Sequence, residues 1–374
     1  MKIALLGPSY PFKGGIAHYT TLLYRHLRTR HEVTFFTFKR QYPKFLYPGK
    51  GDRDASASAL REQDAEQFLD SLNPLSWMRA WRRLRRLQPD LVILPWWVYF
   101  WTPHFYYLAR RIKRRLDSRL LFVCHNVVEH ESNRMAQLCT SLVLPQGDLF
   151  LVHSKEDEAN LRRILPDGRI ARAFHPSYDV FRQQGIDKES ARRQLGLQGK
   201  TLLFFGFVRP YKGLKYLLEA MPVILQEEKV NLLIVGEFWE GKEECLSQVK
   251  ALGIEQNVLV IDRYVPNEEI EAFFAASDLL VMPYVSATGS GLVQLAFGMD
   301  MPVLVTEVGG LPEVVRDGQT GFIVPPRDST AIAARVIQYY RMNLEEPFRE
   351  NVRKDRHRFS WEHLVEAIER LYGL

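Results

Sequence analysis

The chain has 374 residues, of which 46% are hydrophobic and 25% charged, a composition typical of a globular protein and not of a disordered one. Its length exceeds what one hydrophobic core usually organises, so two domains are expected. No apolar run approaches the roughly 18 to 20 residues of a membrane span, and the first residues predict a short strand and no signal peptide, so we expect a cytoplasmic protein. The cysteines Cys124, Cys139 and Cys245 are too few and too scattered to indicate disulfides or a cysteine-based zinc site.

Charge is distributed unevenly along the chain, whose net charge is +6. Residues 1–175 hold 28 Lys and Arg against 16 Asp and Glu, a balance of +12, which leaves −6 for the remainder. The cations concentrate in two segments of helical spacing with one apolar face, residues 77–87 and 109–116. Such segments are commonly solvated helix faces, but they also attract anionic lipid headgroups. Peripheral association with the inner face of a membrane is therefore a hypothesis, and no nucleic-acid partner is expected.

The N-terminal segment predicts a strand, a glycine-rich loop and a helix, because the apolar run ends at Gly7 and apolar residues resume at helical spacing after Gly14 and Gly15. The loop has neither the GxGxxG spacing of a dinucleotide site nor the Gly-Lys-Ser/Thr of a phosphate-binding loop. Neither NAD nor a bare nucleoside triphosphate is favoured. A ligand could still approach the backbone closely at the two glycines.

A strand over residues 32–40 is followed by a polar stretch, residues 41–73, which we expect to be a loop. It contains the triplet Asp52, Arg53 and Asp54, a pattern that can hold a divalent metal on a nucleotide diphosphate. Because no strand adjoins the triplet, a surface loop is the simpler interpretation. We expect no metal site and no cofactor.

The strand predicted over residues 90–101 has an unusually aromatic carboxyl end, with Trp96, Trp97 and Tyr99. Ligands in open parallel sheets bind beyond the carboxyl ends of strands, so these side chains could face an acceptor. Packing in the core is the commoner use of such residues.

Histidines follow the next two predicted strands. His125 lies directly at the carboxyl end of a strand, where it is well placed to hydrogen-bond a bound polar group. Residues 148–161 repeat this arrangement, with His153 at the tip of the strand.

Residues 201–224 start a second unit of strand, glycine turn and helix. Arg209 and Lys212 lie between Gly206 and Gly213, immediately before the helix, and two cations at such a turn are a good clamp for a diphosphate. Strands and helices alternate through the rest of the chain, which predicts an α/β fold with two parallel sheets.

Residues 278–317 predict a further unit of strand, helix and strand. The turn before its helix contains small residues that leave backbone N–H groups open to an anion: Ser286, Thr288, Gly289, Ser290 and Gly291. A site for a phosphorylated ligand and a tight strand-to-helix connection both fit this turn.

Taken together, these features resemble the retaining glycosyltransferases of family 4, the glycosyl transferases group 1. The resemblance extends over nearly the whole chain and rests on Gly14 with Gly15, His125, and four motifs: residues 209–213 (RPYKG), 290–297 (SGLVQLAF), 302–324 and 359–366. The family implies the GT-B fold, in which two Rossmann-like parallel-sheet domains face each other across a cleft. It implies an acceptor domain at residues 1–180, a nucleotide-sugar donor domain at 181–355, and a C-terminal helix at 356–374 that packs back toward the first domain.

The resemblance also implies an activity: transfer of a sugar from a UDP- or GDP-sugar to a glycan or lipid-linked acceptor hydroxyl, with retention, in glycan, polysaccharide or glycolipid biosynthesis. Arg209 and Lys212 would hold the diphosphate, and His125 would contact the sugar. The other implied donor-binding residues are Gly14, Gly15, Gly206, Thr288, Ser290, Gly291, Leu292 and Gln294. Because cations would stabilise the leaving diphosphate, no metal is required.

The sequence departs from the family at a pair of glutamates spaced E-x7-E. Depending on the alignment, their places hold Thr288 with Ala296 or Ala287 with Leu295, so neither alignment supplies a carboxylate. Gln294 could replace part of the lost polar contacts. Two alternatives stay open: a nucleotide-sugar epimerase, and a catalytically silent protein that binds a sugar nucleotide or a partner.

Overall fold

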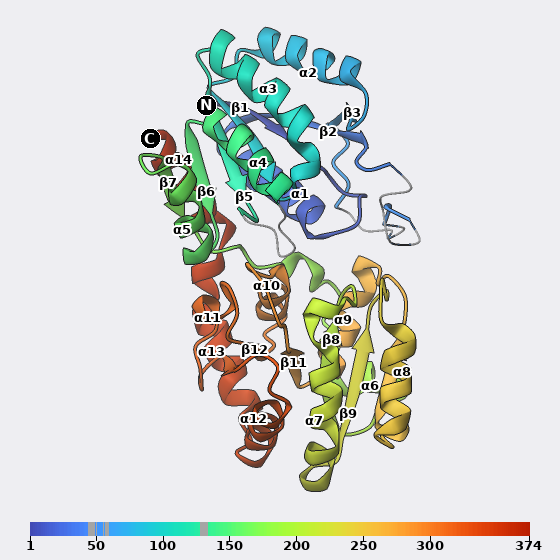
Figure 1. The fold of residues 1–374 in the computed structure, drawn as a ribbon. Helices are drawn as coiled ribbons and strands as arrows, with labels where there is room; N and C mark the ends of the chain where they lie inside the picture. The colour runs from blue at the N-terminus through green and yellow to red at the C-terminus, as the bar shows by residue number, and fades with distance from the viewer. Residues whose placement is uncertain (44–48, 50, 55, 57–59, 128–133) are drawn as a thin grey trace. The chain divides into compact units, whose positions relative to one another are not determined.

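The computed structural model describes the chain except residues 44–48, 50, 55, 57–59 and 128–133 (Figure 1). Two compact units are present, one of Met1–His175 with Trp361–Leu374 and one of Pro176–Ser360. Each unit has its own parallel sheet and its own cluster of buried apolar residues. The predicted α/β fold with two parallel sheets is confirmed.

The first unit contains a parallel sheet of seven strands in the order β3-β2-β1-β4-β5-β6-β7. The strands are β1 (Lys2–Leu6), β2 (Glu32–Arg40), β3 (Glu66–Asp70), β4 (Leu91–Trp96), β5 (Arg119–Cys124), β6 (Leu149–Val152) and β7 (Arg169–Arg172). Every residue of β4 is buried, which explains its continuous apolar sequence. Cys124 pairs with Val152, and Val152 with Arg172, so β5, β6 and β7 end at the same level.

The helices of the first unit are α1 (Gly15–Leu27), α2 (Pro74–Leu87), α3 (Thr102–Arg115), α4 (Arg134–Val143), α5 (Lys155–Ile164) and α14 (Trp361–Tyr372). Helix α3 lies between α2 and α4 and contacts both (Figure 1). The last helix, α14, contacts α1, β6 and β7. Its Glu369 pairs with Arg30 at 3.0 Å and with His31 at 2.9 Å, which ties the end of the chain to the first unit.

The second unit contains a parallel sheet of six strands in the order β10-β9-β8-β11-β12-β13. The strands are β8 (Lys200–Phe205), β9 (Val230–Val235), β10 (Val258–Ile261), β11 (Leu279–Met282), β12 (Val303–Thr306) and β13 (Gly321–Val324). The helices are α6 (Lys188–Leu195), α7 (Leu214–Glu227), α8 (Lys242–Ala251), α9 (Asn267–Ala276), α10 (Gly291–Gly298), α11 (Leu311–Val314), α12 (Ser329–Arg341) and α13 (Glu345–Asp355). The strand order reverses between β8 and β11, as it does between β1 and β4 in the first unit. Ligands bind at such switch points, beyond the carboxyl ends of the strands.

The polar stretch 41–73 is not only a loop, because it contains the edge strand β3. The expected surface position of its acidic triplet is also wrong in part, since Asp54 is buried. The Asp54 N–H donates to Pro11 O at 2.7 Å, and Phe12 forms an isolated bridge with Arg53. These backbone bonds draw the triplet against the loop that precedes α1.

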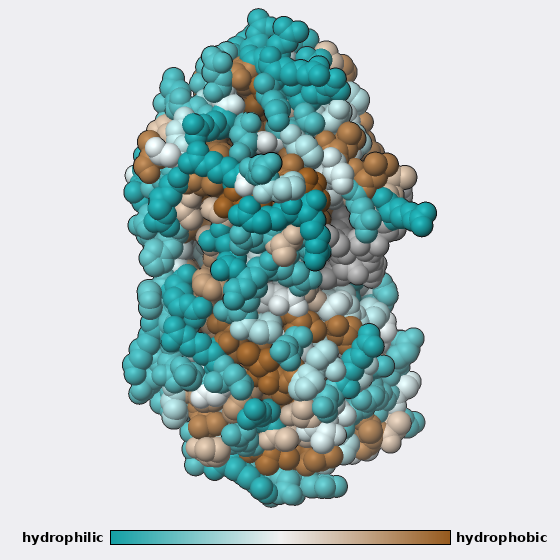
Figure 2. Space-filling model, turned by 60° about the vertical axis from the view of Figure 1, so that its left-hand side comes forward, coloured by the Kyte–Doolittle hydropathy of each residue, from teal (hydrophilic) through white to brown (hydrophobic). Residues whose placement is uncertain are grey.

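The surface is mainly hydrophilic on the face shown in Figure 2, where hydrophobic residues form separate areas. Large apolar side chains are exposed on two helices of the first unit, including Leu75 of α2 (70% exposed) and Leu138 of α4 (65% exposed). Within the described residues, no helix is both long and apolar enough to cross a bilayer.

Candidate functional site

The second unit places the predicted cations at its switch point. β8 leads into a turn that contains Arg209 and Lys212, and the neighbouring β11 leads into the turn before α10. Val285 N donates to Tyr211 O at 2.8 Å, so the two turns are joined by a backbone hydrogen bond. The sequence separates these turns by about seventy residues, but the parallel sheet brings them together.

Lys212 is buried, with 9% of its surface exposed, although it is a cation. Desolvation and the neighbouring Arg209 lower the pKa of Lys212 from 10.5 to about 7. Its Nζ lies 5.6 Å from the centre of the Tyr284 ring, and no carboxylate of the described residues forms an ion pair with it. A buried cation without a counter-charge is costly, and a bound anion would remove that cost.

Glycines make this arrangement sterically possible. A Cβ on Gly206 would lie 3.1 Å from Lys212 Nζ, and one on Gly213 would lie 2.0 Å from Pro283 O. Gly213 has a φ of +68° and is the N-cap residue of α7. A side chain at Gly213 would push this turn away from the turn that follows β11, and a side chain at Gly206 would displace the lysine nitrogen.

The turn before α10 differs in part from the expectation that its backbone N–H groups are open to an anion. Ser290 caps the helix, and its Oγ accepts from Leu292 N at 3.3 Å, so this N–H has a partner within the turn. Thr288 is buried, and its carbonyl accepts from Gly310 N at 2.8 Å. Gln294 is also buried, and its side-chain Oε1 has no hydrogen-bond partner among the described residues.

Aromatic side chains that sequence analysis did not assign surround Arg209. Its guanidinium carbon lies 5.3 Å from the ring centre of Tyr211 and 5.6 Å from that of Trp239. Trp239 in turn lies 4.5 Å from Phe207, which also contacts Tyr264. Phe207, Trp239 and Tyr264 follow β8, β9 and β10, and only the strand order, which the sequence does not show, reveals that they are neighbours.

His125 lies at the carboxyl end of β5 in the first unit, as its position in the sequence indicated. Its backbone N–H donates to Trp96 O at 2.8 Å, and its ring packs edge to face on Tyr19, with 4.5 Å between centres. Burial, together with His153 and His175, holds the pKa of His125 well below its usual value. The ring is therefore neutral at pH 7.

The two glycines at the start of α1 leave open space around their backbone. Gly14 has a φ of +107° and caps the helix, and a Cβ added at Gly14 or Gly15 would have no atom within 4 Å. Backbone can be approached closely at both positions. The structure places these glycines and His125 in the first unit, and Gly206, Arg209 and Lys212 in the second.

The three aromatic residues predicted to face an acceptor differ in exposure. Trp96 is 1% exposed and packs with Phe105 in the core, the alternative use considered for it. Trp97 is nearly buried, and its Nε1 donates to Tyr42 Oη at 3.0 Å. Tyr99 lies in a short 3-10 turn and keeps part of its surface exposed.

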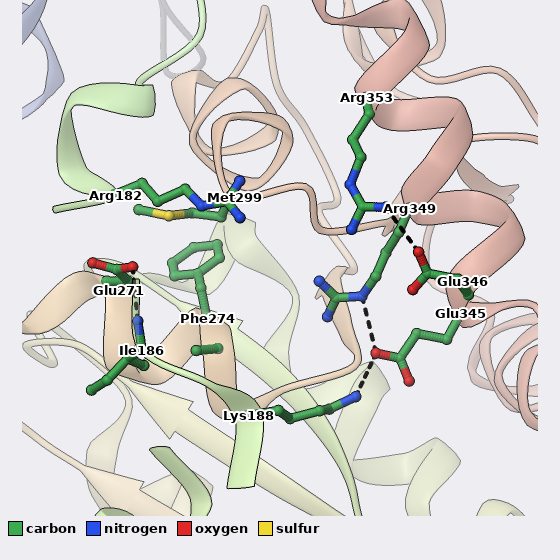
Figure 3. Close-up of a pocket in the computed structure, with 11 residues that line it drawn as sticks. Arg182, Ile186, Lys188, Glu271, Phe274, Met299, Glu345, Glu346, Arg349 and Arg353 are labelled. Carbon is green, nitrogen blue, oxygen red and sulfur yellow. Dashed lines mark hydrogen bonds and ion pairs between the residues drawn. The ribbon is translucent and has the colours of Figure 1, made fainter. Parts of the chain in front are cut away.

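A cavity of about 250 Å³ lies elsewhere in the second unit (Figure 3). None of the predicted site residues lines it, and its charged side chains have partners. Arg353 binds Glu346 at 2.8 Å, Arg349 binds Glu345 at 3.0 Å, and Glu271 accepts from the backbone that follows Arg182. The two arginine contacts lie within α13, the Glu271 contacts tie α9 to the segment before α6, and Lys188 of α6 pairs with Glu345 of α13, so these side chains form a structural network.

Comparisons with known proteins match both units. A family model described as Glycosyltransferase Family 4 matches residues 13–173, and one described as Glycosyl transferases group 1 matches residues 199–342. The D-inositol 3-phosphate glycosyltransferase of Streptomyces scabiei is 29% identical over 79% of this chain and 70% of that protein. The N-acetyl-alpha-D-glucosaminyl L-malate synthase of Bacillus anthracis is 30% identical over 50% of this chain and 49% of that protein. The chain thus spans from about half to 70% of the lengths of these relatives.

Solved structures share the fold of this chain over its whole length. Sucrose-phosphate synthase from Thermosynechococcus elongatus has a TM-score of 0.77 at 18% identity, covering 100% of this chain and 98% of that one. Anabaena Alr3699/HepE, solved in complex with UDP and glucose, has a TM-score of 0.75 at 19% identity, covering 100% of both chains. At this level of identity, the likeness shows a shared fold.

Proposed function

The chain belongs to family 4 of the glycosyltransferases and has the GT-B fold, and from this premise we propose that it transfers a sugar from a nucleotide sugar to an acceptor hydroxyl with retention of configuration. The donor is a UDP- or GDP-sugar, and the acceptor is a glycan or a lipid-linked molecule of a biosynthetic pathway in the cytoplasm. The second unit binds the donor, and the first unit binds the acceptor. Alr3699/HepE, which shares the fold, was solved with UDP-glucose, which supports the class of donor.

The observation that carries this proposal is the buried Lys212 beside Arg209. Two cations at the switch point of a parallel sheet, of which Lys212 has no carboxylate partner among the described residues, match the charge of a diphosphate. The first turn of α10 adds backbone N–H groups and the positive end of a helix dipole.

The chemistry follows from where charge develops. The bond between the sugar carbon and the diphosphate oxygen breaks, and its electron pair stays on the phosphate. The acceptor oxygen bonds to the face that the diphosphate leaves, and its proton passes to the departing phosphate oxygen. Arg209 and Lys212 stabilise this leaving group more strongly than the bound donor, which lowers the barrier.

We infer that two polar residues of the second unit replace part of the family's missing glutamates. Thr288 is buried in the turn before α10, Gln294 is buried in the helix itself, and Gln294 Oε1 lacks a partner among the described residues. A neutral amide can hold sugar or ribose hydroxyls but cannot supply a carboxylate's charge. His125 of the first unit is the proposed contact to the transferred sugar.

Binding of nucleotides tests the proposal without knowledge of the acceptor. Calorimetric titration with UDP, GDP and their sugar conjugates should identify one base that binds. Lys212→Ala should weaken that binding, whereas Lys215→Ala, an exposed lysine of the following helix, should not. If no nucleotide or nucleotide sugar binds the wild-type protein, the proposed donor site is wrong.

We also propose that the first unit docks on an anionic membrane. Arg82, Arg83, Arg85 and Arg86 of α2 are exposed, and α2 packs beside the basic α3. Each such cation near an acidic leaflet contributes on the order of 1 kcal/mol. Co-sedimentation with phosphatidylglycerol liposomes at low salt should detect binding that four Arg→Ser substitutions at these positions abolish. Equal sedimentation of the variant would contradict this docking.

A further inference from the structure

Three histidines gather at one edge of the first sheet. β5, β6 and β7 are neighbours and end at the same level, so His125 and His153, which follow β5 and β6, lie side by side. Their ring centres are 5.4 Å apart, and His175 lies 5.3 Å from His153. Tyr19 packs on all three rings and on Trp361 of α14.

Hydrogen bonding determines which nitrogen of His153 carries a proton. His153 Nδ1 lies 2.9 Å from Ala173 O, and a carbonyl can only accept, so Nδ1 carries the hydrogen. Burial lowers the pKa of His153 to about 4, and the ring is neutral at pH 7. His153 Nε2 therefore presents a lone pair and accepts hydrogen bonds.

No hydrogen-bond donor of the described residues reaches His153 Nε2. His153 Nε2 and the neighbouring His125 Nε2 are both buried, and neither has a hydrogen-bond partner among the described residues. Buried polar atoms without partners are rare in native proteins, and each calls for a ligand or an ordered water. Two such nitrogens on adjacent rings point to a ligand group that both can contact.

We propose that His153 is a second sugar-binding residue, which together with His125 holds a hydroxyl group of the substrate, with His153 Nε2 accepting its hydrogen. This inference rests on the proposed function and names a residue that the activity alone does not require. A hydroxyl suits the site because it donates to one nitrogen while its oxygen remains available to the other. The hydroxyl belongs either to the transferred sugar or to the acceptor.

Two substitutions separate the nitrogens of His153. In His153→Asn the amide nitrogen can still donate to Ala173 O, but the Nε2 acceptor is lost. In His153→Gln the longer side chain places an acceptor near the position of Nε2. His357→Asn is the matched control, because His357 makes the same Nδ1 contact to a carbonyl, Lys354 O at 2.9 Å, on the exposed surface.

Kinetics identify the source of the hydroxyl. His153→Asn should raise one KM about tenfold, as expected for one lost hydrogen bond to a substrate, and His153→Gln should restore most of it. A rise in the donor KM, together with a changed rate of donor hydrolysis in the absence of acceptor, assigns the hydroxyl to the transferred sugar. A rise in the acceptor KM alone assigns it to the acceptor. If both KM values stay at the level of His357→Asn while only the melting temperature changes, the nitrogens bind water and the inference is wrong.

A direct measurement keeps the inference separate from the proposed activity. In the full-length protein labelled with ¹⁵N-histidine, UDP-glucose, GDP-mannose and free glucose are added in turn. The Nε2 resonance of His153 should move toward that of a hydrogen-bonded nitrogen with at least one of them, even if the protein transfers no sugar. A resonance that is shifted neither by these three ligands nor by an extract containing glycan and lipid-linked acceptors would overturn the inference, whereas absence of turnover with a shifted resonance would overturn only the proposed function.

Discussion

Lys212 lies with its ammonium nitrogen against Gly206, where a Cβ would come within 3.1 Å of Nζ. Gly206 also has a φ of +90°, a conformation that residues with a side chain rarely adopt. The absence of a side chain at Gly206 therefore leaves room for a buried cation at the carboxyl end of β8, next to the turn that precedes α10. In the proposed function, this positive charge stabilises the anionic leaving group.

Removal of either cation should slow turnover without unfolding the protein. Lys212→Ala and Arg209→Ala each delete charge-assisted donors to the leaving diphosphate, so kcat should fall about 100-fold or more. Steady-state kinetics with the cognate donor measure the effect, and Lys215→Ala, which changes an exposed lysine, serves as the control. Wild-type turnover in either variant would remove these residues from the diphosphate site.

The pH dependence of donor capture should report the ionisation of Lys212. With its pKa lowered to about 7, free Lys212 is charged below that pH and loses its charge as pH rises through it. Because the anionic donor selects the charged form, kcat/KM for the donor should fall toward a tenfold loss per pH unit above about pH 7. In Lys212→Arg the guanidinium stays charged, so this break should vanish. An unchanged profile in the variant would assign the break to another group.

Activity should persist in excess EDTA. Side-chain cations and the N-terminus of α10 supply positive charge at the leaving group, so the proposed mechanism needs no divalent ion. Turnover measured before and after exhaustive dialysis against the chelator checks this. Loss of activity that Mg²⁺ or Mn²⁺ restores would contradict it and would direct attention to Asp52 and Asp54.

His104 should make the protein less stable in acid. His104 is 1% exposed and packs among Phe38, Trp101 and Phe105. Neither nitrogen of its ring has a hydrogen-bond partner among the described residues. Burial lowers the pKa of His104 from 6.5 to about 3. Below pH 6.5, His104 binds a proton in the unfolded chain but stays neutral in the folded chain. The free energy of unfolding therefore falls as pH falls from 6.5 toward 3. Between pH 7 and pH 5, this one histidine lowers the free energy of unfolding by about 2 kcal/mol.

Substitution isolates that cost. In His104→Leu, denaturant titrations at pH 7 and 5 should show a difference in unfolding free energy about 2 kcal/mol smaller than in the wild type, whatever the packing effect of leucine. Because each protein is compared with itself at two pH values, the effect of leucine on packing is the same at both and drops out of the difference. The same pH difference in both proteins would mean that His104 is protonated or accessible in the folded state.

Gly309 should not tolerate a side chain. Its φ is +51°, and a Cβ would lie 1.7 Å from Ala287 O in the turn before α10. Gly309→Ala should cost roughly 3 kcal/mol or more of stability, because the backbone of that turn must move. Gly318, with a φ of +69° and no atom within 4 Å of an added Cβ, is the matched control, and Gly318→Ala should cost only about 1 kcal/mol. Similar losses in thermal or chemical unfolding would show that the close contact does not matter.

The elements that sequence analysis located well are those whose burial shows in the residues themselves. β4 and β11 are buried throughout and appear as short apolar runs, and α2 covers the basic amphipathic segment 77–87. The edge strand β3 was missed because only Leu69 of its five residues is buried, so its sequence has no apolar pattern. Its pairing with β2 depends on the rest of the sheet.

The candidate site was predictable where its residues are local in sequence. Arg209, Lys212 and the flanking glycines lie within one strand-to-helix turn, and the structure keeps them there. The burial of Lys212 and the grouping of His125 with His153 were not predictable, because they depend on which strands are neighbours. Contacts such as Arg182 with Asp300, at 2.6 Å, connect residues more than one hundred positions apart and leave no local pattern.

Transfer of a labelled sugar tests the central claim most directly. The wild-type protein is incubated with UDP- and GDP-sugars labelled in the sugar, together with an extract that contains glycan and lipid-linked acceptors, and the products are separated. The account predicts that one donor loses its label to a new glycoside of unchanged anomeric configuration, with release of nucleoside diphosphate. Label that stays on the nucleotide, either in a different sugar or untouched despite tight binding, would contradict glycosyl transfer.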